Sequence, residues 1–106
     1  MKTVAVLGTM DTKGAELKYI RDLIRERGLD TLCIHTGIFE PLFEPDITNT
    51  EVAAAVNEDI EKIAARKDRA IATDIMARGT EAIVPELYKQ GKFDGIISVG
   101  GSGGTS

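Results

Sequence analysis

Residues 95–106 read GIISVGGSGGTS, an apolar run that leads directly into a segment made mostly of glycine. Asp94-Gly95 is typical of a turn that enters a buried strand, and Gly95–Val99 is predicted to be that strand. Glycines lack Cβ atoms, so the backbone N–H groups after the strand can converge on one point, as phosphate-binding loops of open α/β sheets do. We therefore predict an anion-binding turn, with a flexible Gly/Ser linker as the alternative.

Two earlier stretches are predicted to form strands of the same sheet. Thr3–Leu7 is a continuous apolar run closed by Gly8, as expected of a central parallel strand, and Asp30–His35 is predicted to form the second strand. Apolar residues at helical spacing lie between them: Leu17, Ile20, Leu23 and Ile24. A helix that ends at Gly28 and joins two strands predicts a right-handed βαβ unit, and hence a parallel sheet.

The middle of the chain is predicted to be a loop followed by helices. Ile38–Thr50 contains two prolines and should be irregular, with a short helix capped by Thr48 or Thr50 after it. The longest helix is predicted from Lys67 or Asp68 to Lys89. Its apolar residues form two adjacent lines, one of Ile71, Ile75, Gly79, Ala82, Ile83 and Leu87, and one of Ala72, Met76, Thr80 and Val84. More than one surface must therefore cover this helix.

These elements predict an α/β fold, a Rossmann-like three-layer α/β/α arrangement with a parallel sheet of strand order 2-1-3. The elements that would complete such a sheet after the third strand are missing. Residues 1–106 are therefore interpreted as the N-terminal part of a Rossmann-like nucleotide-binding domain, incomplete at its C-terminus and belonging to a larger protein.

Composition excludes several classes of partner. The chain has 106 residues and a net charge of −4, with its basic residues dispersed, so neither nucleic acid nor a membrane surface is an expected partner. No secretory or transmembrane run is evident, which favours a cytoplasmic protein. His35 and Cys33 are the only residues of their kinds, so no metal site is expected, and Cys33 is predicted to be a buried structural thiol. We expect His35 to be hydrogen-bonded or simply exposed.

The loops after the first and third strands should meet where the direction of chain travel reverses. Neither contains a G-x-G-x-x-G or Walker motif, so a composite phosphate site is predicted instead of a standard one. Asp11 or Thr12 is the expected N-cap of the first helix, and Lys13 is expected to reach the phosphate as a point charge. The candidate cofactor-binding residues are Thr9, Met10, Asp11, Thr12, Lys13, Gly100, Gly101, Ser102, Gly103, Gly104 and Thr105.

Several motifs together resemble the ATP-binding proteins typified by the tomato mosaic virus resistance protein, a family with many uncharacterised bacterial and fungal members. They are Leu7–Gly14, Pro45-Asp46-Ile47 with Glu51-Val52-Ala53, Met76–Gly79 and Gly100–Thr105. The resemblance covers essentially the whole chain but only about the first quarter of a family member. It implies two Rossmann-like halves, the first of which binds the nucleotide through Asp11–Lys13 and Gly100–Thr105.

The leading hypothesis is therefore a module that binds a nucleotide, ATP above all and with Mg²⁺ as an option. One alternative is part of an enzyme that acts on a phosphorylated small metabolite, with Asp11 or His35 as acid or base. Another is an oligomerisation module, because the long helix and the apolar loop Phe39–Phe43 could make a subunit interface. A homo-oligomer is expected on that ground, and no catalytic residue is assigned.

Overall fold

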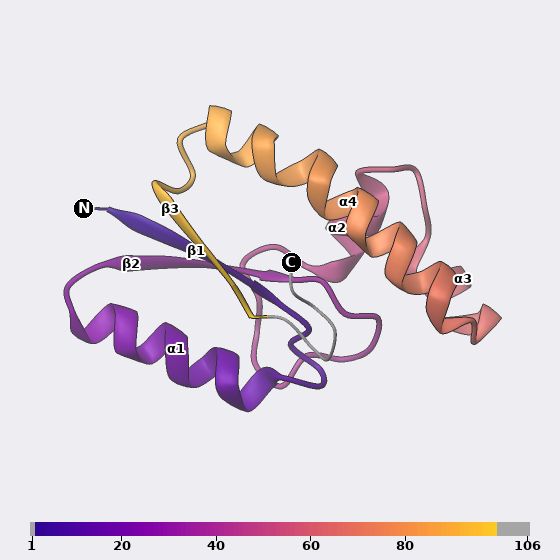
Figure 1. Ribbon diagram of the computed structural model, residues 1–106, viewed down its shortest axis with the longest axis horizontal. Helices are drawn as coiled ribbons and strands as arrows, with labels where there is room; N and C mark the ends of the chain where they lie inside the picture. The colour runs from indigo at the N-terminus through magenta and orange to yellow at the C-terminus, as the bar shows by residue number, and fades with distance from the viewer. Residues whose placement is uncertain (1, 100–106) are drawn as a thin grey trace.

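The computed structural model describes residues 2–99, and its elements follow the order β1, α1, β2, α2, α3, α4, β3 (Figure 1). Within that range the strands are β1 (Thr3–Gly8), β2 (Asp30–His35) and β3 (Gly95–Val99). The helices are α1 (Gly14–Glu26), α2 (Asn49–Ala54), α3 (Ile60–Arg66) and α4 (Arg69–Lys89). The predicted strands and the long helix are confirmed, and the glycine segment 100–106 lies outside the described residues.

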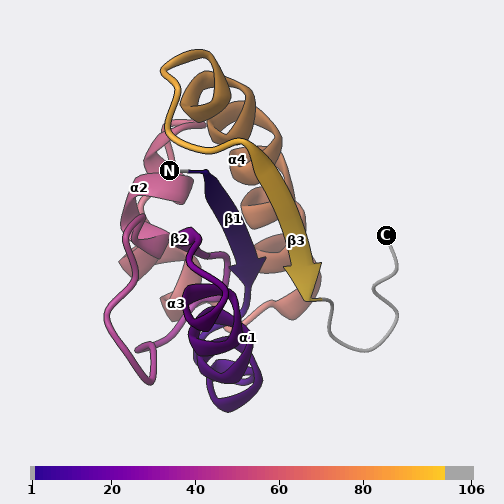
Figure 2. The same ribbon diagram turned by 90° about the vertical axis from the view of Figure 1, so that its left-hand side faces the viewer.

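The sheet has the predicted topology. β1 pairs in parallel with β2 on one side and with β3 on the other, which gives the order β2-β1-β3. α1 lies on one face of the sheet and α4 on the other (Figures 1 and 2). This follows from handedness, since the chain moves from β1 to β2 in one direction and from β2 past β1 to β3 in the opposite one. The α/β fold with a parallel sheet of order 2-1-3 is confirmed.

Two hydrophobic clusters flank the sheet because successive side chains of β1 point to opposite faces. On the α1 face, Val6 packs with Leu17 and with Cys33 of β2. On the α4 face, Ala5 and Leu7 of β1 pack with Ile34 of β2 and with side chains from α2, α3 and α4. Burial of each large aliphatic side chain contributes about 1.5–3 kcal/mol, so these clusters supply most of the driving force for folding.

α4 is covered by both the sheet and α2, as its two apolar lines suggest. The buried face nevertheless combines members of both lines: Ala72, Ile75, Met76, Gly79 and Leu87. Ile71 and Ala82, which the sequence assigned to the inner line, are exposed. At Gly79 a Cβ atom would collide with the backbone carbonyl oxygen of Val52 in α2. A glycine in mid-helix is thus explained by the close approach of another backbone.

The outer edge of β2 is closed by the segment that contains Pro45-Asp46-Ile47. Ile47 forms an isolated parallel bridge with Ile34, and its carbonyl accepts the N–H of His35 at 3.0 Å. The Asp46 carboxylate accepts the backbone N–H of Cys33 at 2.7 Å. This pairing satisfies backbone groups that an edge strand would otherwise present to other chains.

β3 forms the opposite edge, and no described element lies beyond it (Figure 2). Its two isoleucines point to opposite faces, because Ile96 is opposite Ala5 and Ile97 is opposite Val6. Ile96 is 49% exposed and Ile97 is 40% exposed. The sheet is therefore well covered over β1 and β2 and incompletely covered over β3.

Candidate functional site

His35 organises the edge of the sheet where the loops after β1 and β2 meet. It is fully buried at the end of β2, and its Nδ1 atom accepts the backbone N–H groups of Met10 at 3.2 Å and Gly37 at 3.1 Å. With two donors directed at Nδ1, the ring proton is assigned to Nε2, which donates to the carbonyl of Phe39 at 2.8 Å. His35 is thus hydrogen-bonded, and its two ring nitrogens bind three backbone groups that belong to the two loops after β1 and β2.

Asp11 ties the β1 loop to the segment that follows β2. One carboxylate oxygen accepts the backbone N–H of Thr12 at 2.9 Å, and the other accepts that of Phe39 at 3.1 Å. The prediction that Asp11 or Thr12 caps α1 is wrong, since Lys13 occupies the N-cap position. The packing explains Gly37, where a Cβ atom would collide with the Asp11 carboxylate and approach the His35 ring at 2.8 Å.

The N-terminus of α1 opens on the same edge of the sheet. Lys13 has φ −115° and ψ 23°, and no side chain provides a capping hydrogen bond at this end of the helix. Its ammonium group lies 3.8 Å from Glu16 in a half-exposed pair, which is worth about 0–1 kcal/mol. The partial positive charge of the helix end is therefore reinforced by a lysine and only weakly offset by the neighbouring carboxylate.

The remaining predicted contacts in this loop shape its turn. The N–H of Lys13 donates to the carbonyl of Thr9 at 2.7 Å, and the hydroxyls of Thr9 and Thr12 lie 2.7 Å apart. Met10 is buried in the cluster on the α1 face, and its carbonyl accepts the N–H of Leu42 at 3.1 Å. Thr12 and Lys13 are thus the residues of this loop best placed to meet a ligand. Contact with a ligand remains a prediction for all five residues of the loop that the sequence proposed, Thr9–Lys13.

The second half of the predicted composite site is the glycine segment after β3. Gly100, Gly101, Ser102, Gly103, Gly104 and Thr105 all lie outside the described residues. β3, however, ends at Val99 beside Gly8, the last residue of β1. The glycine segment therefore starts from the strand next to the one that leads into Lys13.

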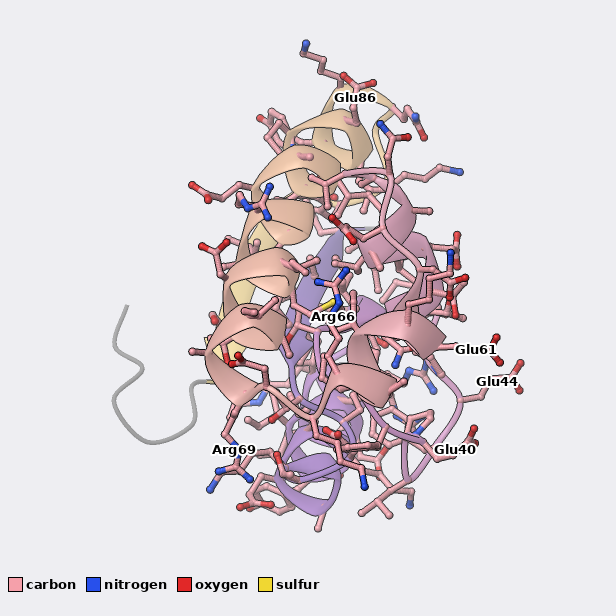
Figure 3. The ribbon with its side chains drawn as sticks, turned by 90° about the vertical axis from the view of Figure 1, so that its right-hand side faces the viewer. Glu40, Glu44, Glu61, Arg66, Arg69 and Glu86 are labelled. Carbon is pink, nitrogen blue, oxygen red and sulfur yellow. The ribbon has the colours of Figure 1, made fainter. Side chains whose placement is uncertain are left out.

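A groove of about 490 Å³ is lined in part by Phe39, whose backbone N–H donates to Asp11, and the sequence did not suggest this groove. Residues 38–41 and the starts of α2 and α3 line it, with Glu40, Asp59 and Glu61 as its carboxylates. Figure 3 shows Glu40, Glu44 and Glu61 extending from the same side of the molecule. Glu40 lies in the loop after β2, whereas Asp59 and Glu61 lie at the start of α3, so the sequence alone did not place these groove carboxylates together. Only the apolar loop Phe39–Phe43 indicated an unusual surface here.

The apolar loop itself divides between core and surface. Phe43 packs against the α1-side cluster, with the Arg21 guanidinium 4.6 Å from its ring centroid. Phe39 and Leu42 remain about two-thirds exposed. Leu42 nevertheless lies over the start of α1, because a Cβ atom at Gly14 would meet its side chain at 2.7 Å.

Cys33 is a buried thiol, as predicted, and is 1% exposed. Burial is the main cause that raises its pKa from 9.0 to about 11, with the nearby Asp46 charge as the second cause. The thiol is therefore protonated and unreactive at neutral pH. Across residues 2–99, no group of three or more His, Cys, Asp or Glu side chains is arranged to hold a metal ion.

Comparison with known proteins identifies relatives over nearly the whole chain. Residues 2–106 match the N-terminal domain of the uncharacterised protein family UPF0261. A UPF0261 protein of Clostridium tetani is 45% identical over 99% of this chain and 26% of its own length. A UPF0261 protein of Brucella suis is 36% identical over 96% of this chain and 25% of its own, and one of Rhizobium meliloti is 34% identical over the whole chain and 26% of its own.

The chain thus spans about a quarter of the length of the curated relatives that it matches. No solved structure matches it significantly. The resemblance to the ATP-binding proteins typified by the tomato mosaic virus resistance protein is corrected by this result, because the matching family is UPF0261 and that ATP-binding family gives no match.

The structure also contains, within residues 2–99, no helix that is both long and apolar enough to cross a membrane.

Proposed function

The chain belongs to the uncharacterised family UPF0261, and we propose that this N-terminal region binds a nucleotide, with ATP as the first candidate, at the carboxyl edge of its sheet. The observation that carries the proposal is the topological switch point between β1 and β3. β1 and β3 are parallel neighbours, and their connections run over opposite faces. In open α/β sheets, ligands bind in the crevice outside the strand ends at such a point.

The charge at this edge supports a phosphate-bearing ligand. α1 begins there without a side-chain cap, and Lys13 stands at its N-cap position. A helix N-terminus and a lysine both favour an anion. The glycine segment after β3 would supply converging backbone N–H groups from the other side of the crevice, which completes the proposed composite site.

If Mg²⁺ takes part in binding, we propose that it is bound by the phosphates of the nucleotide and not by a carboxylate of the protein. Both carboxylate oxygens of Asp11 already accept backbone N–H groups, so the carboxylate is committed to holding the loop. We therefore propose that the chain contacts the phosphate oxygens and that the phosphates carry the metal.

The enzymatic alternative has less support. A general acid or base needs a ring nitrogen or carboxylate oxygen that can reach a substrate. Both ring nitrogens of His35 are bonded inside the protein, and so are both oxygens of Asp11. We therefore propose binding and assign no reaction.

A cytoplasmic location belongs to the same proposal, since nucleotides are solutes of that compartment.

Titration calorimetry and thermal shift with a ligand panel test the proposal. The panel is ATP, ADP, AMP, pyrophosphate and ribose 5-phosphate, each with and without Mg²⁺, and adenosine is the control that lacks phosphate. A ligand present at 100 times its Kd raises the free energy of unfolding by about 2.7 kcal/mol. We expect binding that strengthens with the number of phosphates and is absent for adenosine. Equal responses to adenosine and ATP, or no response to any phosphate compound, would overturn it.

A further inference from the structure

An apolar groove of about 330 Å³ runs along α1 on the side of β3. Its walls are aliphatic side chains, with one guanidinium at the end: Ile20, Leu23, Ile24, Arg27, Leu29 and Ile97. Leu23 is 39% exposed and Ile97 is 40% exposed. Ile20 and Ile24 are four residues apart on α1, and Arg27 is the C-cap residue of this helix, so the groove follows the helix axis. The floor of the groove is the uncovered α1-side face of β3.

The handedness of the sheet shows which elements can cover this groove. α4 connects β2 to β3 on the opposite face, and a further crossover from β3 to a parallel strand beyond it would lie on that same α4 face. The helix that directly follows β3 in such a continuation would therefore leave the groove open. The groove is then left for an element from elsewhere in a longer chain or for another molecule.

We propose that in full-length proteins of the UPF0261 family this groove is the docking site of an amphipathic helix from the part of the chain that follows the N-terminal domain. The matched relatives are about four times as long as this chain, so each has a long stretch of sequence outside the matched region that could supply such a helix. The groove's length along α1 suits a helix that packs alongside it, with aliphatic side chains against Leu23 and Ile97 and an acidic one near Arg27.

The size of the groove favours a segment of the same chain over a second copy. Six side chains form its walls, whereas a stable interface between separate proteins takes about 20–30 residues on each side. A covalently attached helix needs fewer contacts, because its effective concentration is on the order of millimolar or higher.

Thiol labelling tests the proposal in the 106-residue chain and in the full-length protein that contains it. Leu23→Cys places a reporter on the α1 wall of the groove, and Ile97→Cys places one on its β3 floor. Lys18→Cys is the matched control, because Lys18 lies on α1 about half a helical turn away from the groove residues and its side chain is 57% exposed. Cys33 is buried, so it adds little background, and its slow labelling in the 106-residue chain is required as the proof that this chain is folded.

We expect both groove thiols to react at least about tenfold more slowly in the monomeric full-length protein than in the 106-residue chain, as for a site that opens only transiently. The Lys18→Cys thiol should react at a similar rate in both. Cross-linking from Leu23→Cys should reach a helix after residue 106 of the same molecule. Groove thiols that remain reactive in the full-length protein would overturn the proposal. So would protection that appears only as the protein dimerises, which would assign the groove to a second copy.

Discussion

The Nδ1 atom of His35, at the end of β2, accepts the backbone N–H of Met10, in the loop after β1, at 3.2 Å. This bond spans 25 residues of sequence and joins the two loops that follow neighbouring strands. Because the histidine ring is fully buried, water cannot replace it as the partner of the Met10 amide. The β1 loop, which leads into Lys13, is therefore positioned by a side chain from a different strand.

Replacement of His35 should destabilise the fold strongly. His35→Ala leaves the N–H groups of Met10 and Gly37 without their acceptor and opens a cavity, so we expect a loss of about 3–5 kcal/mol in the free energy of unfolding. His35→Asn keeps an acceptor near the position of Nδ1 and should lose at least about 1 kcal/mol less. Urea denaturation measures both, and equal losses in the two variants would show that the acceptor is unimportant.

Lys13→Ala should weaken nucleotide binding without unfolding the protein. Its pair with Glu16 is half-exposed at 3.8 Å, so we expect a change in stability within about 0.5 kcal/mol. Loss of a charge-assisted contact to phosphate should raise the Kd for ATP about tenfold to a hundredfold. Calorimetry on the variant gives the Kd directly.

Lys18→Ala is the matched control for Lys13→Ala. Lys18 also lies on α1 and also pairs with a carboxylate at 3.8 Å, that of Asp22, but it is more than a helical turn from the N-terminus. The Kd of this variant should equal that of the wild type. A drop in affinity of the same size in both variants would indicate a nonspecific charge effect and would remove Lys13 from the site.

Gly79→Ala should destabilise the protein, although alanine is the better helix former. The added Cβ would collide with the Val52 carbonyl, so α2 must move away from α4, and we expect a loss of about 2 kcal/mol or more. Ala77→Gly, at an exposed position of the same helix, calibrates intrinsic helix propensity and should cost about 1 kcal/mol. Thermal melts compare the two, and a more stable Gly79→Ala variant would contradict the close approach of α2.

Stability should fall in alkaline solution through Cys33. The pKa of its thiol is raised from 9.0 to about 11 in the folded protein, so the folded state holds the proton more tightly than the unfolded chain. The stabilising contribution is complete below pH 9 and is lost as the pH rises towards 11. Relative to Cys33→Ala, the wild type should lose roughly 1 kcal/mol between pH 8 and pH 10. Parallel stability profiles for the two proteins over that range would rule out the effect.

Much of the fold followed from local patterns. The apolar run at Thr3–Leu7, the helical spacing after it and the run at Gly95–Val99 each predicted the element that the structure contains. The strand order and the opposite faces of α1 and α4 then followed from the right-handed crossover rule. Such patterns can be recognised in the sequence because hydrophobic periodicity and the handedness of the chain act over short stretches of residues.

The details of the site were less predictable. Asp11 stands where an N-cap is expected, yet its carboxylate bonds the backbone of Phe39, which is 28 residues away. The buried face of α4 contains residues of both apolar lines, because α2 and the sheet both pack against this helix. Neither the hydrogen bond of Asp11 nor the buried face of α4 can be predicted from the local sequence, since each depends on which distant segment packs beside it.

The sequence by itself determined the parallel α/β architecture and the edge at which a ligand is proposed to bind, because hydrophobic periodicity and the handedness of crossovers act through neighbours in the chain. Only the tertiary structure decided that His35 and Asp11 hold the loops, that an acidic groove lies beside them and that β3 has an uncovered face. Those features depend on hydrogen bonds and packing between segments far apart in the sequence, which no local pattern records.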